Sequence, residues 1–184
     1  MDRKTTVTII LVSLFAALTA VGAFIRIPIP PVPITLQTLF ALLCGLVLPL
    51  PQSLFSILVY LFLGLVGLPI FTTGGGIAAM TGPTGGYLIG LLPAVLAEGL
   101  VMRLWRTGSR ASFIVASLVG TVCIYIPGLL WLGFSRSLSL AATLASGLYP
   151  FIVGDVLKLI VASQVAYATS SRVRLLMTQG GEED

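Results

Sequence analysis

Charged residues and histidine are scarce in this chain of 184 residues. Lys, Arg, Asp and Glu make up 9% of the sequence, and histidine is absent. Soluble domains carry about 25% charged residues, so the composition excludes an ordinary soluble protein. The two cysteines, Cys44 and Cys123, lie within apolar runs, where cysteine usually acts as a small hydrophobic residue. We therefore expect no disulfide, no redox function, no cofactor and no transition-metal site.

Hydrophobic residues are abundant instead, at 57% of the chain. Because a transmembrane helix needs about 20 apolar residues, the runs predict a multi-pass protein of the cell membrane. Its expected fold is all-α, a six-transmembrane-helix bundle forming one domain over residues 1–184. The predicted spans are about 5–24, 35–49, 52–68, 83–105, 112–133 and 150–170. The first run is longer than a signal-peptide core and has no clear cleavage site, so we interpret it as a retained helix.

The basic residues lie at the ends of the predicted spans, so the net charge of +4 does not indicate nucleic-acid binding. With six spans, one side of the membrane receives only Arg26 and Arg136. The other side receives Arg3, Lys4, Arg103, Arg106, Arg110, Arg172 and Arg174. By the positive-inside rule, both termini are therefore predicted to be cytoplasmic. The proline-rich segment 25–33, the glycine-rich segment 74–87 and the start of the last span then share the external side.

The glycine-rich segment separates the third and fourth spans. Six of its fourteen residues are glycine, which permits positive φ angles and close approach of another group. Pro83 suits the first turn of a helix, so we expect a shaped loop that leads into the fourth span. Thr35 is the predicted N-cap of the second span. Residues 138–149 are apolar but short, and form either a separate helix or a partial turn toward the membrane.

Two charged residues, Asp155 and Lys158, lie inside the last span, about two turns from its external end. Residues three apart share a helix face, and charges at this depth usually face a cavity or each other. The pair is either an internal ion pair or a polar anchor for a small ligand, such as a cyclic urea whose N–H groups Asp155 accepts. We interpret Glu98, at the opposite end of the fourth span, as an interfacial acid that is paired or solvated.

Three motifs resemble the BioY family, the biotin-specific S components of energy-coupling factor (ECF) transporters. They are Gly82–Gly90, Pro150–Lys158 and, less strongly, Pro31–Gln37. The resemblance implies a biotin site near the external surface, and partners in the form of a transmembrane coupling subunit and two ATPases. The chain itself contains no nucleotide-binding Gly-x-x-x-x-Gly-Lys motif, so ATP hydrolysis is expected in another protein.

The resemblance also implies roles for individual residues. Asp155 and Lys158 match the polar pair of the family's last helix. The full set of predicted substrate contacts is Thr35, Gln37, Met80, Thr84, Gly85, Gly86, Tyr87, Asp155 and Lys158. Ala16 and Ala20 match a small-xxx-small pattern for docking to the coupling subunit, although spacing alone favours packing within this chain. Residues 74–80 lack the side-chain amide expected in some relatives, for which Thr72, Thr73, Thr81 or backbone groups are candidate substitutes.

Other functions remain open from the residues alone. The chain is also compatible with an S component or autonomous facilitator for another small vitamin, and with a non-transporting assembly subunit. An intramembrane enzyme with Asp155 and Lys158 as catalytic residues is less favoured. Such an enzyme would need a base beside a nucleophile, and the chain has no histidine. We therefore predict a biotin-binding transport subunit and no enzymatic activity.

Overall fold

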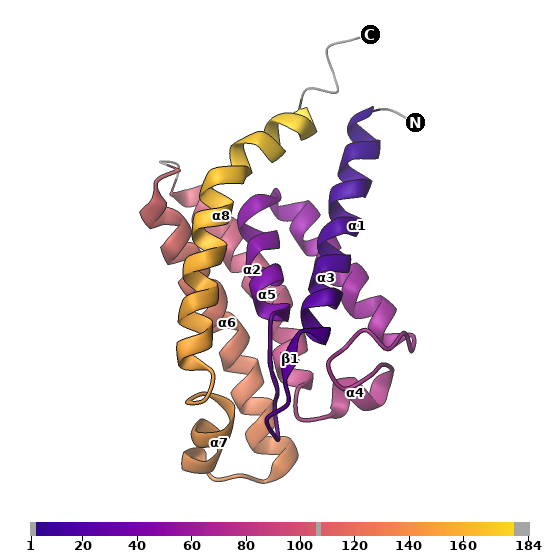
Figure 1. Ribbon diagram of the computed structural model, residues 1–184, viewed down its shortest axis with the longest axis vertical. Helices are drawn as coiled ribbons and strands as arrows, with labels where there is room; N and C mark the ends of the chain where they lie inside the picture. The colour runs from indigo at the N-terminus through magenta and orange to yellow at the C-terminus, as the bar shows by residue number, and fades with distance from the viewer. Residues whose placement is uncertain (1–2, 106–107, 179–184) are drawn as a thin grey trace.

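The computed structural model describes residues 3–105 and 108–178, and in this part of the chain the protein is mainly helical. The elements follow the order α1 (Arg3–Phe24), β1 (Arg26–Ile27), β2 (Ile34–Thr35), α2 (Gln37–Val47), α3 (Leu50–Leu65), α4 (Ile77–Thr81), α5 (Gly85–Leu104), α6 (Arg110–Arg136), α7 (Leu140–Gly147) and α8 (Ile152–Thr178). The helices form an elongated bundle in which α1 begins and α8 ends at the same end of the molecule (Figure 1). Arg106 and the acidic residues 182–184 lie outside the described residues.

Four helices, α1, α5, α6 and α8, are long and apolar enough to cross a membrane. The other two predicted spans form shorter apolar helices, with 11 residues in α2 and 16 in α3. At 1.5 Å per residue α2 is about 16 Å long, roughly half the thickness of the hydrocarbon core. The observed helices therefore confirm the all-α class and the membrane class.

Polar side chains and proline mark where several helices begin. The hydroxyls of Ser109 and Ser139 accept the N–H groups of Ser112 and Ala142 at the starts of α6 and α7, as good N-caps do. Helix α3 starts behind Pro49 and carries Pro51 in its first turn, where a missing N–H is tolerated. The 138–149 region thus contains a separate helix, one of the two alternatives that the sequence left open.

Two predicted helix starts are wrong by one or two residues. Thr35 does not cap α2, because Leu36 is the N-cap, although the Thr35 hydroxyl accepts the N–H of Gln37 at 3.3 Å. Pro83 lies before α5 rather than in its first turn, since Thr84 is the N-cap. The predicted glycine-rich loop also contains the five-residue helix α4, which follows Gly76 at a φ of 79°, a conformation that favours glycine.

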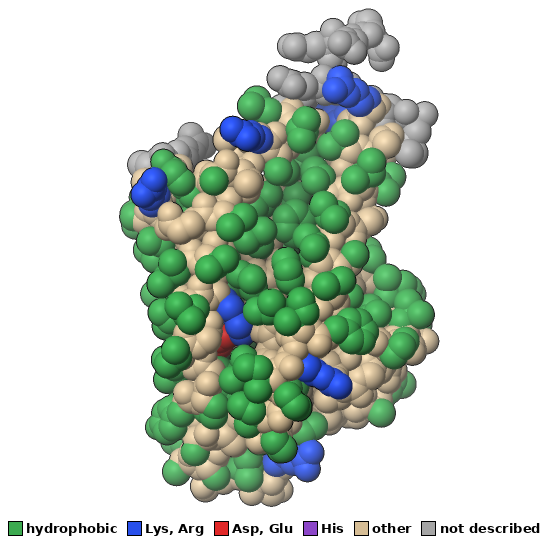
Figure 2. Space-filling model, viewed as in Figure 1, with side chains coloured by type: hydrophobic (Ala, Val, Ile, Leu, Met, Phe, Trp, Pro, Cys, Tyr) green, Lys and Arg blue, Asp and Glu red, His purple; other side chains and the backbone are tan. Residues whose placement is uncertain are grey.

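Helices α5 and α6 make the most extensive contact in the bundle. Glycines allow the two backbones to approach closely: a Cβ at Gly86 would overlap the Pro127 carbonyl and the Trp131 side chain. Helices α2 and α3 pack on the other side of α5, α1 covers α2 and α3, and α8 packs against α2 and α6. Exposed hydrophobic side chains are spread along the whole face drawn in Figure 2, as expected for helices that cross a bilayer.

At the end away from the chain termini, the segment between α1 and α2 folds back over the bundle. Its two short strands pair antiparallel, with Arg26 opposite Thr35 and Ile27 opposite Ile34. The four prolines between residues 28 and 33 make this segment extended rather than helical. The paired strands β1 and β2 lie beside the start of α2 (Figure 1). They bring residues 32–38 over the space between α2, α5, α6 and α8.

Candidate functional site

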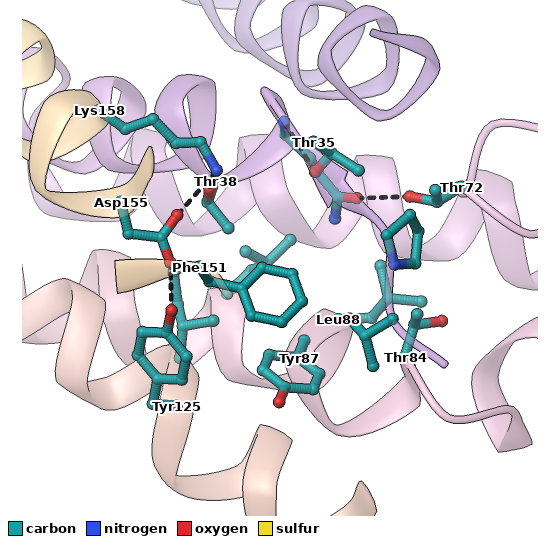
Figure 3. A pocket seen from close by; sticks show the side chains of 15 residues that line it. Thr35, Thr38, Thr72, Thr84, Tyr87, Leu88, Tyr125, Phe151, Asp155 and Lys158 are labelled. Carbon is teal, nitrogen blue, oxygen red and sulfur yellow. Dashed lines mark hydrogen bonds and ion pairs between the residues drawn. The ribbon is translucent and has the colours of Figure 1, made fainter. Parts of the chain in front are cut away.

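A cavity of about 60 Å³ lies between α2, α5, α6 and α8, beneath the β1–β2 segment. Its residues come from five stretches of the chain that are far apart in sequence (Figure 3). They are Val32, Pro33, Thr35, Gln37, Thr38, Thr72, Thr84, Tyr87, Leu88, Leu91, Ile124, Tyr125, Phe151, Asp155 and Lys158. The lining is therefore apolar with a small group of polar side chains, the composition typical of small-molecule sites.

The charged residues of the cavity belong to one hydrogen-bonded network. Lys158 Nζ lies 2.7 Å from Asp155 Oδ1 and also donates to the hydroxyl of Thr38 at 3.2 Å. The hydroxyl of Tyr125 donates to the other carboxylate oxygen, Asp155 Oδ2. Helix α8 thus supplies both charges, and α2 and α6 each supply one neutral partner (Figure 3).

The network leaves hydrogen-bonding capacity for a ligand. An ionised carboxylate has about four acceptor sites, and each oxygen of Asp155 receives one donor from the protein. An ammonium group has three donors, of which Lys158 uses two on Asp155 and Thr38. The pair therefore presents about two acceptor sites and one donor to the cavity, while its side chains are only 15% and 9% exposed.

A second polar contact joins the loop before α4 to the start of α2. The hydroxyl of Thr72 donates to the side-chain carbonyl of Gln37 at 3.4 Å, and both residues are buried. Arg26, on β1, donates from its guanidinium to the backbone carbonyl of Thr72. Residues 66–76 are therefore linked to both sides of the α1–α2 connection, directly above the cavity.

Aromatic side chains form the apolar part of the wall. The rings of Tyr87 and Tyr125 meet edge to face, with centroids 6.2 Å apart. The hydroxyl of Tyr87 donates to the carbonyl of Gly147 at 2.8 Å, which fixes the ring against α7. Phe151, directly before α8, is buried and faces the same space (Figure 3). A ligand in this cavity would meet both aromatic rings and the charged pair.

Residues 1–175 match the BioY family. The chain belongs to the BioY family. A probable biotin transporter BioY of Lysinibacillus sphaericus is 46% identical over 68% of this chain and 64% of that protein. A second, from Pyrococcus horikoshii, is 42% identical over 85% of this chain and 91% of that protein. The resemblance predicted from the three motifs is therefore confirmed.

A solved structure supports the same assignment. The crystal structure of the S-component for biotin from an ECF-type ABC transporter superposes with a TM-score of 0.83 at 30% identity. The match covers 91% of this chain and 93% of that one. The chain is accordingly a multi-pass membrane protein with the fold of that S component.

Six of the nine predicted contact residues of this BioY-family chain line the cavity: Thr35, Gln37, Thr84, Tyr87, Asp155 and Lys158. The other three are not among the lining residues. Gly85 and Gly86 face the Met80 carbonyl and the α6 side chain of Trp131, where they permit close packing. Met80 is half-buried and packs against the core.

Sequence reasoning missed several lining residues, most notably Tyr125 and Thr38. Tyr125 is the only tyrosine in the predicted span 112–133, a signal that could have identified it. Thr38 lies one residue after Gln37, in the first turn of α2. Of the three threonines named as substitutes for the missing amide, Thr72 lines the cavity, while Thr81 is exposed and bonds to Ile77 in α4.

The interpretation of Glu98 as a paired or solvated interfacial acid is wrong. Its side chain is 0% exposed, and neither carboxyl oxygen has a hydrogen-bond partner in the described part of the chain. The helix face that carries Glu98 packs against Gly45 of α2 and Gly120 of α6. The sequence placed Glu98 at the correct end of α5 but did not indicate which face of the helix it occupies.

Proposed function

We propose that this chain is the biotin-binding subunit of an ECF-type uptake transporter. The observation that carries the proposal is the Asp155–Lys158 pair, which retains about two acceptor sites and one donor inside an otherwise apolar cavity. Biotin offers complementary groups, namely two ureido N–H donors, a ureido carbonyl and an apolar thioether ring. The named relatives are transporters, which favours transport over the intramembrane enzyme.

In the binding mode we propose, Asp155 accepts the ureido N–H groups and Lys158 donates to a ligand oxygen. Tyr87, Phe151 and Leu88 cover the apolar ring system, and the amide of Gln37 with Thr72 supplies further polar contacts. Because water is excluded, loss of one polar partner leaves the other unsatisfied and weakens binding. Tyr125 and Thr38 hold the charged pair in place from α6 and α2.

Entry of biotin requires the external segments to move. The cavity of about 60 Å³ is far below the 300–1,000 Å³ of typical small-molecule sites. The residues that close it from outside are 32–38 and Thr72, on the two connections joined by Arg26. We propose that these connections separate to admit biotin and close over it afterwards.

The proposed transporter also needs partners and an orientation. A coupling subunit and two ATPases would drive release of biotin, with α1 as the docking helix. Ala16 is buried in the chain's own bundle and Ala20 is half-buried, whereas Ser13 and Ala17, also four apart, are exposed. The proposed docking surface therefore runs across Ser13 and Ala17 to Ala20.

We also propose six membrane crossings with both termini in the cytoplasm, in which α2 and the extended segment before it share one crossing.

The test is a biotin titration of the purified protein in lipid nanodiscs. The Asp155→Asn variant is expected to bind at least about tenfold more weakly, because hydrogen bonds to charged groups contribute about 1.5–3 kcal/mol each. Ser146→Ala is the matched control, since its hydroxyl bonds within α7 and does not line the cavity. Unchanged affinity in Asp155→Asn would refute the anchor, and preference for another vitamin in competition would refute the ligand.

A further inference from the structure

Glu98 is the second acid of the bundle, and the biotin site does not use it. Of the six acidic residues in the sequence, only Glu98 and Asp155 lie between residues 3 and 181. Asp155 is paired with Lys158 and Tyr125. Glu98 is 0% exposed, and both of its oxygens lack a hydrogen-bond partner among the described residues. A buried carboxyl group of this kind needs a physical explanation.

The carboxyl group occupies space left by two glycines on neighbouring helices. A Cβ at Gly45 of α2 would overlap its Oε2 atom, and a Cβ at Gly120 of α6 would lie 2.8 Å from its Cδ atom. The group is thus enclosed by α2, α5 and α6, in contact with the backbone on both sides. An ionised carboxylate without a counter-charge is very costly in such surroundings, and the neutral acid costs far less.

No basic side chain compensates Glu98 from the helices packed on α5. At this level the ionisable side chains are Cys44 on α2 and Cys123 on α6. Helix α3 carries no acid or base other than Tyr60, whose hydroxyl donates to Ile70, and α4 carries none. The remaining charged residues of α5 and α6 are Arg103, Arg110 and Arg136, which lie at the helix ends.

A second cavity reaches this site from the end of the bundle where α1 begins and α8 ends. It has a volume of about 320 Å³, and Gly45, Gly99, Met102 and Arg103 are among its lining residues. Gly45 therefore has the Glu98 carboxyl on one side and this open cavity on the other. Separation of α2 from α5 at Gly45 would bring water from the cavity to the carboxyl group.

Helix α2 also connects Glu98 to the biotin site. Its first residues, Gln37 and Thr38, line the small cavity, and Gly45 lies two turns further along the same 11-residue helix. The two cavities therefore share α2 as part of their walls, one at its first residues and the other near its end. If α2 moves as one body, a displacement at Gln37 reaches Gly45.

We propose that Glu98 is a proton-binding site inside the bundle, coupled to opening of the biotin site through α2. When α2 packs on α5, the carboxyl group keeps its proton. When α2 moves away to open the biotin site, the O–H bond breaks, the proton passes to water in the second cavity, and a hydrated carboxylate remains. The coupling rests on the proposed biotin function, whereas protonation of Glu98 does not.

Infrared spectroscopy of the protein at neutral pH, in a detergent that has no carbonyl groups, tests protonation directly. The carbonyl-stretch band of a protonated carboxylic acid is expected in the wild type and in Asp155→Asn, and is expected to disappear in Glu98→Gln. Absence of the band from the wild type overturns the proposal even if Glu98→Gln fails to fold. A band that Asp155→Asn removes also overturns it.

The pH dependence of the biotin dissociation rate tests the coupling. Because the packed arrangement binds one more proton than the open one, the share of open protein rises with pH above the ordinary range of glutamate, and biotin is expected to dissociate faster, by up to about tenfold per pH unit. Glu98→Gln cannot release this proton, so its dissociation rate changes less steeply. Parallel profiles for the two proteins overturn the coupling. Biotin binding by the Asp155→Asn variant tests the biotin site separately, because that variant keeps Glu98.

Discussion

At the scale of single residues, the question is whether Asp155 and Lys158 bind a ligand or only stabilise the bundle. Their 2.7 Å contact is consistent with both functions. The neighbouring residues favour the first, because Tyr125 and Thr38 each make one bond and leave the remaining sites directed toward the cavity. A purely structural pair would gain from complete saturation within the protein.

A double substitution separates the two functions. Lys158→Met leaves the Asp155 carboxylate without its cation, so we expect lower thermal stability and weaker biotin binding. Breaking a fully buried pair costs about 3–5 kcal/mol, and the cost here is smaller because the Asp155 side chain is 15% exposed. Adding Asp155→Asn removes the unpaired charge, so stability should recover while binding remains weak. Wild-type affinity in the double variant would identify the pair as structural only.

At the scale of elements, the site lies between the closely packed helices α5 and α6 and the external segments that we propose open. Helices α5 and α6 are held together by glycine contacts along their length. In contrast, the α1–α2 connection is tied to residues 66–76 mainly through Arg26 and the Gln37–Thr72 contact. Opening therefore requires fewer contacts to break at the external segments than between α5 and α6.

The Arg26 contact gives a kinetic prediction. Arg26→Gln removes the guanidinium group that donates to the Thr72 carbonyl and should loosen the external segments, so we expect biotin to dissociate several times faster. Arg136→Gln is the matched control, because it removes an exposed arginine near the same end of the bundle that does not line the cavity. Stopped-flow measurement of the biotin dissociation rate tests this prediction, and equal rates in the two variants would contradict it.

The α5–α6 contact gives a stability prediction. Gly86→Ala would place a methyl group against Pro127 and Trp131, and overpacking typically costs about 1–3 kcal/mol. We expect a lower thermal unfolding temperature in nanodiscs. Gly154→Ala is the control in α8, where the nearest atom to the added Cβ would be 3.9 Å away. Equal unfolding temperatures would show that the backbones adjust at no cost.

The sequence predicted long elements well and local packing poorly. Residues 83–105 were predicted as a span and Gly85–Leu104 form α5, because the bilayer sets the length of an apolar run. Helix α4 was missed, since five residues between glycines carry no helical periodicity. Burial of Glu98 depends on Gly45 and Gly120, which are far away in the chain, so no local pattern could indicate it. Tyr125 stands out as the only tyrosine of the span 112–133, but its bond to Asp155 joins residues 30 apart in the chain, which the sequence did not indicate.

At the scale of the whole molecule, orientation in the membrane decides which cavity meets biotin. The site lies at the end of the bundle opposite the start of α1 and the end of α8 (Figure 1). Arg3, Arg103, Arg110 and Arg172 belong to the terminal end. With the positive-inside rule, this arrangement favours a biotin site that opens outward.

Cysteine labelling in intact cells tests this orientation. A cysteine at exposed Thr81, in α4, should react with a membrane-impermeant maleimide from outside. A cysteine at exposed Ser171, near the end of α8, should react only after permeabilisation. The wild-type chain, which has only its two native cysteines, shows how much labelling occurs without an added cysteine. The reverse pattern would invert the proposed topology.

The cavity wall has one more consequence, because it is assembled from residues 32–38, 72, 84–91, 124–125 and 151–158. Four helices, α2, α5, α6 and α8, and two connections thus contribute to one wall, and bound vitamin would hold these segments together. A ligand at a hundred times its dissociation constant raises the free energy of unfolding by about 2.7 kcal/mol. Since proteases attack opened chains, a cell starved of the vitamin would degrade this protein faster than a well-supplied one. Its abundance would then respond to nutrition without any change in gene expression.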